Sequence, residues 1–354
     1  MVKNNKKDFL EKNPLFICWT AFNEENTLED SYVSAKKSIL FSKNKFLGKY
    51  KKELHFRGII CHNGCTDKTP EIADKISSDS EEYFRVDVLK SERGMVKAQQ
   101  KCIDYIKKAN KLESPVLFLD ADCLIDEKAL FMMIEELKKH KKLKIVGGQP
   151  TPLRYKGLNP YKRLLDNILN FRAYHPSSEI AVNPNKSYHA YARIDPQYLG
   201  ANFEEKSKIY FHGRFFMMRN VKCWDVKKDF GAEDIYLGRS INFKYGPGSI
   251  RMLYHANVFF SPILSLFDYY KIYLREFKFL DQLRKSHPEF EEIRNYSKTK
   301  MDLKYRKRLS LIDKIYFDLH NFLRFIVYNL SKKGIFFTCG KNIWSYESKS
   351  KLIK

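Results

Sequence analysis

The sequence predicts an α/β protein with a mostly parallel central sheet flanked by helices. Short apolar runs, typical of strands buried on both faces, occur at residues 15–19 and 116–118, and two mostly apolar runs at 56–61 and 86–89 are further strand candidates. Segments with helical spacing of apolar residues separate these runs. This alternation favours parallel strands joined by right-handed crossovers, with a polar loop at the end of each strand.

The first strand, residues 15–19, leads into a polar loop that contains Asn23 and Glu24, and a helical pattern then extends from Leu28 to about Leu40. The second strand, residues 56–61, leads into a loop that carries Asn63 and Asp67. Thr69 followed by Pro70 is typical of an N-cap and the first position of a helix. We therefore expect a helix to begin after Thr69.

The third strand, residues 86–89, ends in a turn with Arg93 and Gly94, and a helix follows with apolar or small residues at helical spacing from Met95 to Ile106. The fourth strand, residues 116–118, is followed by Asp120 and Asp122. A helix over about 127–140 and a strand at 144–146 come next. All four polar loops follow strand ends, so we expect them to converge at one edge of the sheet.

The rest of the chain has a less regular pattern. The many prolines in residues 147–208 predict loops and short helices. Residues 210–218 form a strand-like run, and a helical pattern begins near residue 231. From about residue 255 the composition becomes aromatic and basic, which predicts a C-terminal amphipathic helical extension with a helix over about 309–330. We expect a catalytic domain at 1–254, with a nucleotide-binding half at about 14–125 and an acceptor half at about 126–254, and a separate C-terminal region at 255–354.

Asp120 and Asp122 stand one residue apart at the end of a buried strand, which is where open α/β sheets bind ligands. Carboxylates at this spacing suit Mg²⁺ or Mn²⁺ shared with a phosphate. The pair therefore predicts a divalent-metal site for a phosphorylated ligand.

Five motifs in order resemble a family 2 glycosyltransferase of the GT-A fold, over roughly residues 14–280. They are Asn23-Glu24-Glu25, Asn63 to Thr69, Arg93-Gly94 with Lys97-Ala98, Asp120-Ala121-Asp122, and Glu233-Asp234. The resemblance implies an inverting, metal-dependent transfer of a sugar from a nucleotide-sugar donor to a hydroxyl acceptor.

The resemblance also implies roles for single residues. Asp122 is the expected direct metal ligand, and Asp120 lies beside it near the ribose and the donor sugar. The expected nucleotide-sugar contacts further include Asn23, Glu24, Asn63, Asp67, Arg93 and Lys97. Arg93 and Lys97 are cations beside a glycine turn and suit a diphosphate, although a solvated helix start is the alternative.

For the acceptor, the resemblance implies that Asp234 of the Glu233-Asp234 pair is the general base. Favourable charge at a helix N-terminus is the alternative explanation for these acids. His212 lies in the stretch that borders the acceptor site in relatives, and Arg275 is a candidate diphosphate contact. The Gln and Trp of the processive polysaccharide synthases are missing near Arg275, so we expect transfer of one or a few sugars.

The formal net charge of +23 implies an anionic partner. No nucleic-acid-binding module is recognisable, so we expect no nucleic acid as partner. The basic, aromatic region from 255 favours an anionic membrane surface, with packing on the catalytic domain as the alternative. A lipid-linked or cell-surface glycan precursor, hence a glycan or glycolipid, is the expected acceptor.

The expected location is the cytoplasm, peripherally on the cytoplasmic face of the membrane. The seven cysteines are dispersed without CxxC pairs, which fits reduced thiols in the cytosol. The N-terminus lacks the apolar segment of a signal peptide. No apolar stretch has the ~18 residues of a spanning helix.

Two other protein classes remain alternatives at this point. A nucleotidylyltransferase also uses a metal and carboxylates, but it usually carries a glycine-rich basic loop after the first strand, where this chain has Asn23 and Glu24. An inactive homologue could act as a scaffold, although Asp120, Asp122 and Asp234 are all retained.

Overall fold

The computed structural model describes most of the 354 residues. The described residues are 13–174, 179–181, 211–226, 233–246, 248–290, 299–301, 306–307 and 309–332. The chain divides into two compact units. The first comprises residues 1–149, 211–229 and 249–258, and the second comprises 150–210, 230–248 and 259–354. The end of the predicted C-terminal region, residues 333–354, lies outside the described residues.

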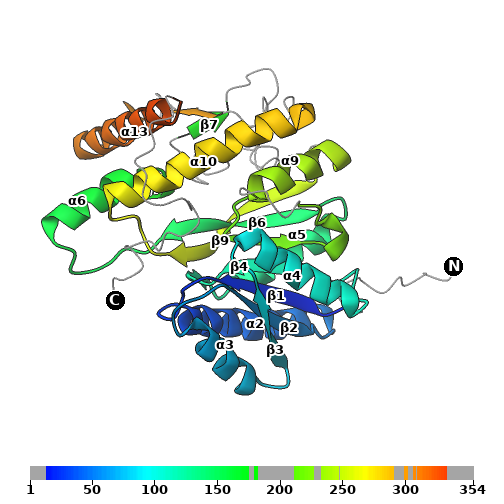
Figure 1. Ribbon diagram of the computed structural model, residues 1–354. Helices are drawn as coiled ribbons and strands as arrows, with labels where there is room; N and C mark the ends of the chain where they lie inside the picture. The colour runs from blue at the N-terminus through cyan, green and yellow to red at the C-terminus, as the bar shows by residue number, and fades with distance from the viewer. Residues whose placement is uncertain are drawn as a thin grey trace. The chain divides into compact units, whose positions relative to one another are not determined.

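An eight-stranded sheet with the order β3-β2-β1-β4-β8-β6-β9-β5 organises the fold (Figure 1). Its strands are β1 (Leu15–Ala21), β2 (Phe56–Asn63), β3 (Phe84–Ser91), β4 (Val116–Asp120), β5 (Cys123–Ile125), β6 (Ile145–Pro152), β8 (Phe215–Met218) and β9 (Ile250–Phe260). Strands β1 to β4 pair in parallel, whereas β8 runs antiparallel to β4 and to β6. The prediction of an α/β fold with a mostly parallel sheet is confirmed.

Four helices of the first unit connect the strands, as the sequence pattern predicts. They are α2 (Leu28–Tyr50), α3 (Thr69–Ser78), α4 (Met95–Lys108) and α5 (Ala129–Lys139). Helix α4 packs on β1, β2 and β3, and α2 packs on α5 and β5. Helix α2 is longer than predicted because the buried Ser42 and Phe46 continue its inner face beyond Leu40.

The start of α3 corrects the predicted N-cap. Thr69 is the first residue of the helix rather than its N-cap, and its hydroxyl accepts a hydrogen bond from the Glu24 N–H (2.7 Å). The Thr69 N–H donates instead to Asp67 Oδ1 (3.0 Å). Asp67 therefore satisfies the helix start, and Thr69 is used to hold the neighbouring loop.

The core of the first unit lies against β1, where Trp19 is fully buried. Its indole N–H donates to the Ser31 hydroxyl of α2 (3.1 Å), so the one polar atom of the ring is satisfied. The ring also lies beside Tyr32 and Phe84, with centroid distances of 6.3 Å to each. This cluster fixes α2 and β3 to the central strand that leads into the first loop.

Gly148 of β6 lies where the chain has no room for a side chain. A Cβ at this position would meet Phe215 Cδ1 at 2.2 Å and the Ala256 carbonyl oxygen at 2.6 Å. We expect Gly148→Ala to lower the free energy of unfolding by ~3 kcal/mol, because overpacking a rigid core forces backbone shifts. Denaturant unfolding measures this, with Gly48→Ala as the control: Gly48 has nothing within 4 Å of its Cβ position. Equal stabilities for the two variants would contradict this packing.

The second unit contains the helices α6 (Pro160–Leu169), α7 (Phe171–Tyr174), α9 (Glu233–Tyr245), α10 (Leu266–Ser286) and α13 (Leu311–Lys332). The short strands β7 (Glu179–Ala181) and β10 (Thr299–Met301) pair antiparallel. Helices α6, α10 and α13 share an apolar cluster. Its buried members are Leu165, Ile168, Leu169, Tyr269 and Val327.

The helical C-terminal region is confirmed by α13, whereas the region after residue 147 is more regular than predicted. Strand β6 continues to Pro152, and α6 begins with Asn159 as its N-cap, whose side chain accepts from the Lys162 N–H (2.8 Å). Pro160 occupies the first position of this helix, where its missing N–H leaves no hydrogen bond unmade, and the prediction of short helices in this region holds for α6. Among the described helices, none has the length and apolar character that crossing a bilayer requires.

Candidate active site

The loops that follow β1 and β2 are joined by reciprocal hydrogen bonds. The Asn23 side chain accepts from the Thr66 N–H (2.8 Å) and donates to the Thr66 hydroxyl (3.1 Å). The Glu25 N–H donates to Asp67 Oδ2 (3.1 Å), and the Lys68 N–H donates to Glu25 (3.0 Å). Asn23 adopts a left-handed conformation (φ 54°), which asparagine tolerates better than most residues. The two loops therefore act as one preorganised element.

Asn63 links this element to the turn after β3. Its buried side chain donates to the Ala21 carbonyl (2.8 Å) and accepts from the Gly94 N–H (3.1 Å). The Arg93 guanidinium lies over the Phe22 ring, 4.4 Å from its centroid. The predicted convergence of these three loops at one edge of the sheet is confirmed.

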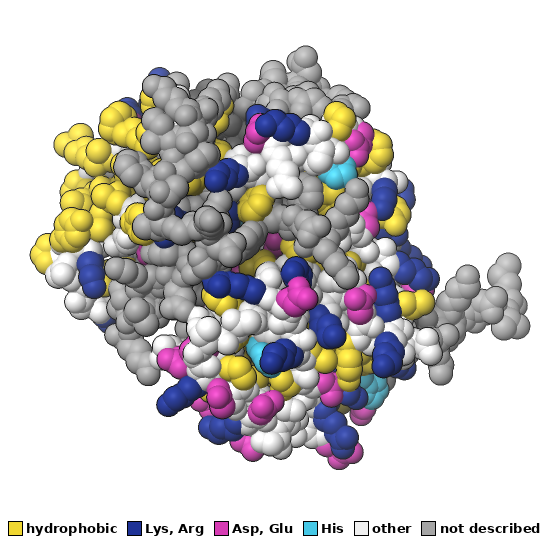
Figure 2. Space-filling view, viewed as in Figure 1, with side chains coloured by type: hydrophobic (Ala, Val, Ile, Leu, Met, Phe, Trp, Pro, Cys, Tyr) yellow, Lys and Arg dark blue, Asp and Glu magenta, His cyan; other side chains and the backbone are white. Residues whose placement is uncertain are grey.

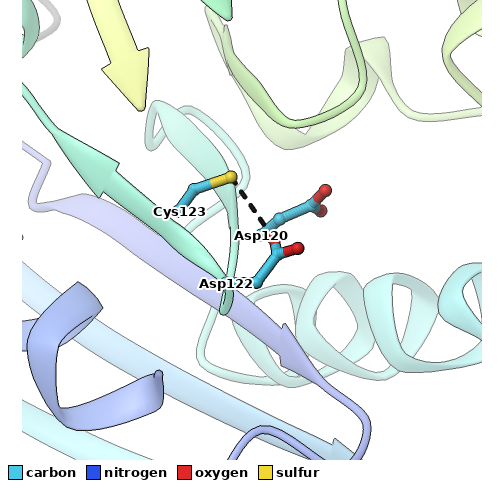
Figure 3. Close-up of side chains that lie close together, drawn as sticks. All are labelled: Asp120, Asp122 and Cys123. Carbon is cyan, nitrogen blue, oxygen red and sulfur yellow. Dashed lines mark hydrogen bonds between the residues drawn. The ribbon is translucent and has the colours of Figure 1, made fainter. Parts of the chain in front are cut away.

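The carboxylates of Asp120 and Asp122 lie at the same edge of the sheet. Asp120 ends β4 opposite Thr20 of β1, so it follows directly beside the first loop. Ligand atoms of Asp120, Asp122 and Cys123 all lie within 4.8 Å of one another (Figure 3). Among the described residues, this is the one group of at least three His, Cys, Asp or Glu side chains that could hold a metal ion.

The chemistry of these three side chains favours a hard divalent cation. Cys123 is buried, and both burial and the negative charge of Asp122 raise the pKa of its thiol well above the usual range. Its sulfur lies 3.4 Å from Asp122 Oδ1, to which the thiol donates a hydrogen bond. The two carboxylates offer hard oxygen atoms, which suit Mg²⁺ or Mn²⁺ better than a thiol-preferring metal.

Arg214 is a site residue that the sequence reasoning did not assign. Its Nη1 lies 3.4 Å from Asp122 Oδ1 and 3.7 Å from Asp120 Oδ2, and its backbone carbonyl accepts from the Asp120 N–H (3.0 Å). The antiparallel pairing of β8 with β4 brings it there, since Phe215 pairs with Leu119. Arg214 thus partly neutralises the two carboxylates.

We expect Arg214→Met to tighten Mn²⁺ binding about tenfold, because a guanidinium next to the ligands repels a second cation. Titration calorimetry of Mn²⁺ into the wild type and the variant measures the change at low ionic strength. Arg214→Lys keeps the positive charge and is the matched control, with affinity near that of the wild type. Weaker Mn²⁺ binding in Arg214→Met would mean that Arg214 orients the carboxylates instead.

His212 lies in the turn that leads into β8. Its Nδ1 accepts from the Arg214 N–H (3.3 Å), and its carbonyl accepts from the Phe215 N–H (3.3 Å). This turn positions Arg214 beside Asp122. Contact of His212 with an acceptor stays a prediction.

The other predicted site residues lie at the following places. Lys97, in the first turn of α4, forms an ion pair with Glu92 (2.6 Å). The buried Glu24 accepts a hydrogen bond from the Thr27 hydroxyl (2.8 Å).

Asp234 lies in the first turn of α9, where its Oδ1 accepts a hydrogen bond from the Ile235 N–H (2.8 Å). Glu233, the residue before it, is buried. Arg275 is on α10 and, like the acids of α9, belongs to the second unit.

Glycosyl transferase family 2 matches residues 16–226, which is more than half of the chain. The chain therefore belongs to glycosyl transferase family 2, and it is a glycosyltransferase.

Two relatives add to this assignment. Poly-beta-1,6-N-acetyl-D-glucosamine synthase of Staphylococcus aureus is 33% identical over 134 residues, which cover 36% of this chain and 26% of that protein. The chain therefore matches about a quarter of this relative's length. Among solved structures, a mannosyltransferase from Pyrobaculum calidifontis in complex with GDP-Man and Mn²⁺ superposes with a TM-score of 0.52 at 14% identity, covering 92% of this chain and 76% of that one. This likeness supports the GT-A fold.

Proposed function

We propose that this glycosyltransferase moves a sugar from a nucleoside-diphosphate sugar to a hydroxyl acceptor with inversion, and that Asp122 and Asp120 hold Mg²⁺ or Mn²⁺ for the diphosphate. The observation that carries the proposal is the pair of carboxylates at the end of β4, next to three hydrogen-bonded loops. The structural relative named above holds GDP-Man and Mn²⁺, which agrees with this ligand class.

The bound metal would stabilise the negative charge that develops on the diphosphate as the glycosidic bond breaks. Arg214 adds a fixed positive charge beside the same carboxylates. Asn23, Glu24, Asn63 and Asp67 belong to the loops that would face the nucleoside, and Arg93, Lys97 and Arg275 would supply further positive charge to the diphosphate. In this proposal the loop hydrogen bonds keep the nucleotide side of the site rigid before the donor binds.

Asp234 is proposed as the general base, with Glu233 beside it. The acceptor oxygen attacks the anomeric carbon as its bond to the diphosphate breaks, the hydroxyl proton passes to the Asp234 carboxylate, and the bonding electron pair leaves with the diphosphate. Attack from the side opposite the leaving group inverts the anomeric configuration. The hydrogen bond from the Ile235 N–H, together with the helix N-terminus, holds this carboxylate in place.

The acceptor is proposed to be a lipid-linked or cell-surface glycan precursor, met at the cytoplasmic face of a membrane. The net charge of +23 and the similarity to a polysaccharide synthase support this class. Residues 1–254 would carry the catalysis, with His212 near the acceptor.

A donor panel tests the proposal. The purified chain is incubated with UDP- and GDP-sugars and Mn²⁺ or Mg²⁺, and release of nucleoside diphosphate is followed with and without a chelator. We expect one donor to be hydrolysed slowly, only with metal. If no donor reacts at millimolar concentration with either metal, the proposed donor site is wrong.

A further inference from the structure

Helix α13 exposes large apolar side chains along most of its length. Leu311 is 76% exposed, Phe325 64% and Phe322 59%. The remaining exposed members of this set are Ile312, Ile315, Leu319 and Ile326. We call these seven residues the α13 outer face.

The spacing of these residues puts them on one side of the helix. Leu311, Ile315, Leu319, Phe322 and Ile326 follow one another at intervals of three or four residues, which is the period of a single helix face. The buried residues of α13 face the other way. They are Phe317, His320 and Val327. The helix therefore packs on α6 and α10 with one side and shows a second apolar side to the surroundings.

Exposed apolar side chains also occur on the two helices that α13 contacts. Leu164 of α6 and Leu266 of α10 are both more than 40% exposed, as is Tyr161. Figure 2 shows hydrophobic side chains gathered at the upper left edge of the view, where Figure 1 places α6 and α13. Large exposed apolar side chains that gather on one face of a protein typically mark a binding surface.

The charges around the α13 outer face favour an anionic partner. Asp318, the acid that lies among the exposed apolar residues, is paired through both carboxylate oxygens with Arg306. Asp313 is hydrogen-bonded to the hydroxyl of Ser310 (2.8 Å). Lys307 is exposed close to the start of the helix, and Lys314 lies in its first turn. These two acids are thus engaged within the protein, while Lys314 lies on α13 next to the exposed apolar residues and Lys307 is exposed shortly before the helix.

We propose that the α13 outer face docks on an anionic lipid bilayer, with the helix lying along the interface. Exposed Phe, Leu and Ile side chains bordered by lysine match the acyl and headgroup zones of such a surface. A second copy of this chain is a poorer occupant, because two molecules that each carry +23 repel one another. This docking is independent of the sugar-transfer reaction, so either can fail without the other.

Co-sedimentation of the full chain with vesicles tests the proposal. We expect binding to vesicles of phosphatidylcholine with phosphatidylglycerol, and at least ~tenfold weaker binding to phosphatidylcholine alone. The double variant Phe322→Ser/Phe325→Ser is expected to lose at least ~tenfold in partition coefficient, because two exposed rings no longer insert. Leu311→Ser/Ile312→Ser, at the other end of the face, is expected to act in the same way.

The matched control is Val33→Ser/Leu47→Ser, which removes two exposed apolar side chains from α2 in the first unit. Its partition coefficient is expected to stay within about twofold of the wild type. Unchanged thermal unfolding of the α13 variants shows that their fold is intact. Wild-type chain that stays in the supernatant, or α13 variants that bind as well as the control, would overturn the proposal. So would sedimentation velocity showing a wild-type dimer that Phe322→Ser/Phe325→Ser dissociates.

Discussion

Asp122→Asn is expected to lower kcat/KM for the sugar donor about a thousandfold, because it removes a charged metal ligand and with it the stabilisation of the leaving diphosphate. The amide has nearly the same shape as the carboxylate, so the fold at the end of β4 is kept. Steady-state kinetics over a range of Mn²⁺ concentrations measure the effect. The saturable dependence of the rate on metal should disappear together with the activity.

The control for this variant is Asp104→Asn on the exposed side of α4, where Asp104 accepts a hydrogen bond from Gln100 (2.7 Å). It makes the same chemical change away from the candidate site and should leave kcat/KM within about twofold of the wild type. An Asp122→Asn enzyme that keeps its metal dependence would place the metal elsewhere.

Asp234→Asn is expected to slow sugar transfer about a thousandfold while donor binding stays unchanged, because an amide cannot take the proton of the acceptor hydroxyl. The side-chain oxygen can still accept from the Ile235 N–H, so the first turn of α9 is preserved. Transfer rates with acceptor and calorimetric binding of the donor separate the two effects.

Asp281→Asn on α10 is the matched control, since Asp281 is an exposed partner of Lys285 in the second unit. A loss of donor affinity as large as the loss of rate in Asp234→Asn would contradict a role as general base. It would assign Asp234 to donor binding instead.

The local pattern of the sequence was enough to predict the first half of the fold. Strands β1 and β4 contain short apolar runs, whereas β2 and β3 mix apolar residues with charged ones such as Arg57 and Asp87. Each of β1 to β3 is followed by a polar loop with a clear helix signal after it, but the short β5 that follows β4 was not predicted. Strand β9 was not predicted, because its eleven residues mix Arg, His and Asn with apolar side chains. Its place between β6 and β5 depends on pairings between distant segments, which residue spacing does not encode.

The same limit applies to the candidate site. The carboxylate pair is visible in the sequence because its members stand one residue apart, whereas Arg214 reaches it through the antiparallel pairing of β8 with β4. Asn63 and Asp67 were predicted as nucleotide contacts from the resemblance alone. The structure adds that both side chains hold the loops together, a role that only the relative positions of β1, β2 and β3 reveal.

Binding of UDP and GDP to the purified wild-type chain, measured by titration calorimetry with and without Mn²⁺, tests the central claim most directly. If Asp120 and Asp122 hold a metal for the diphosphate, one nucleotide binds in the presence of Mn²⁺, and the heat disappears with a chelator and in Asp122→Asn. Absence of binding for both nucleotides at millimolar concentration with Mn²⁺, or binding that is the same without metal and in Asp122→Asn, would contradict it.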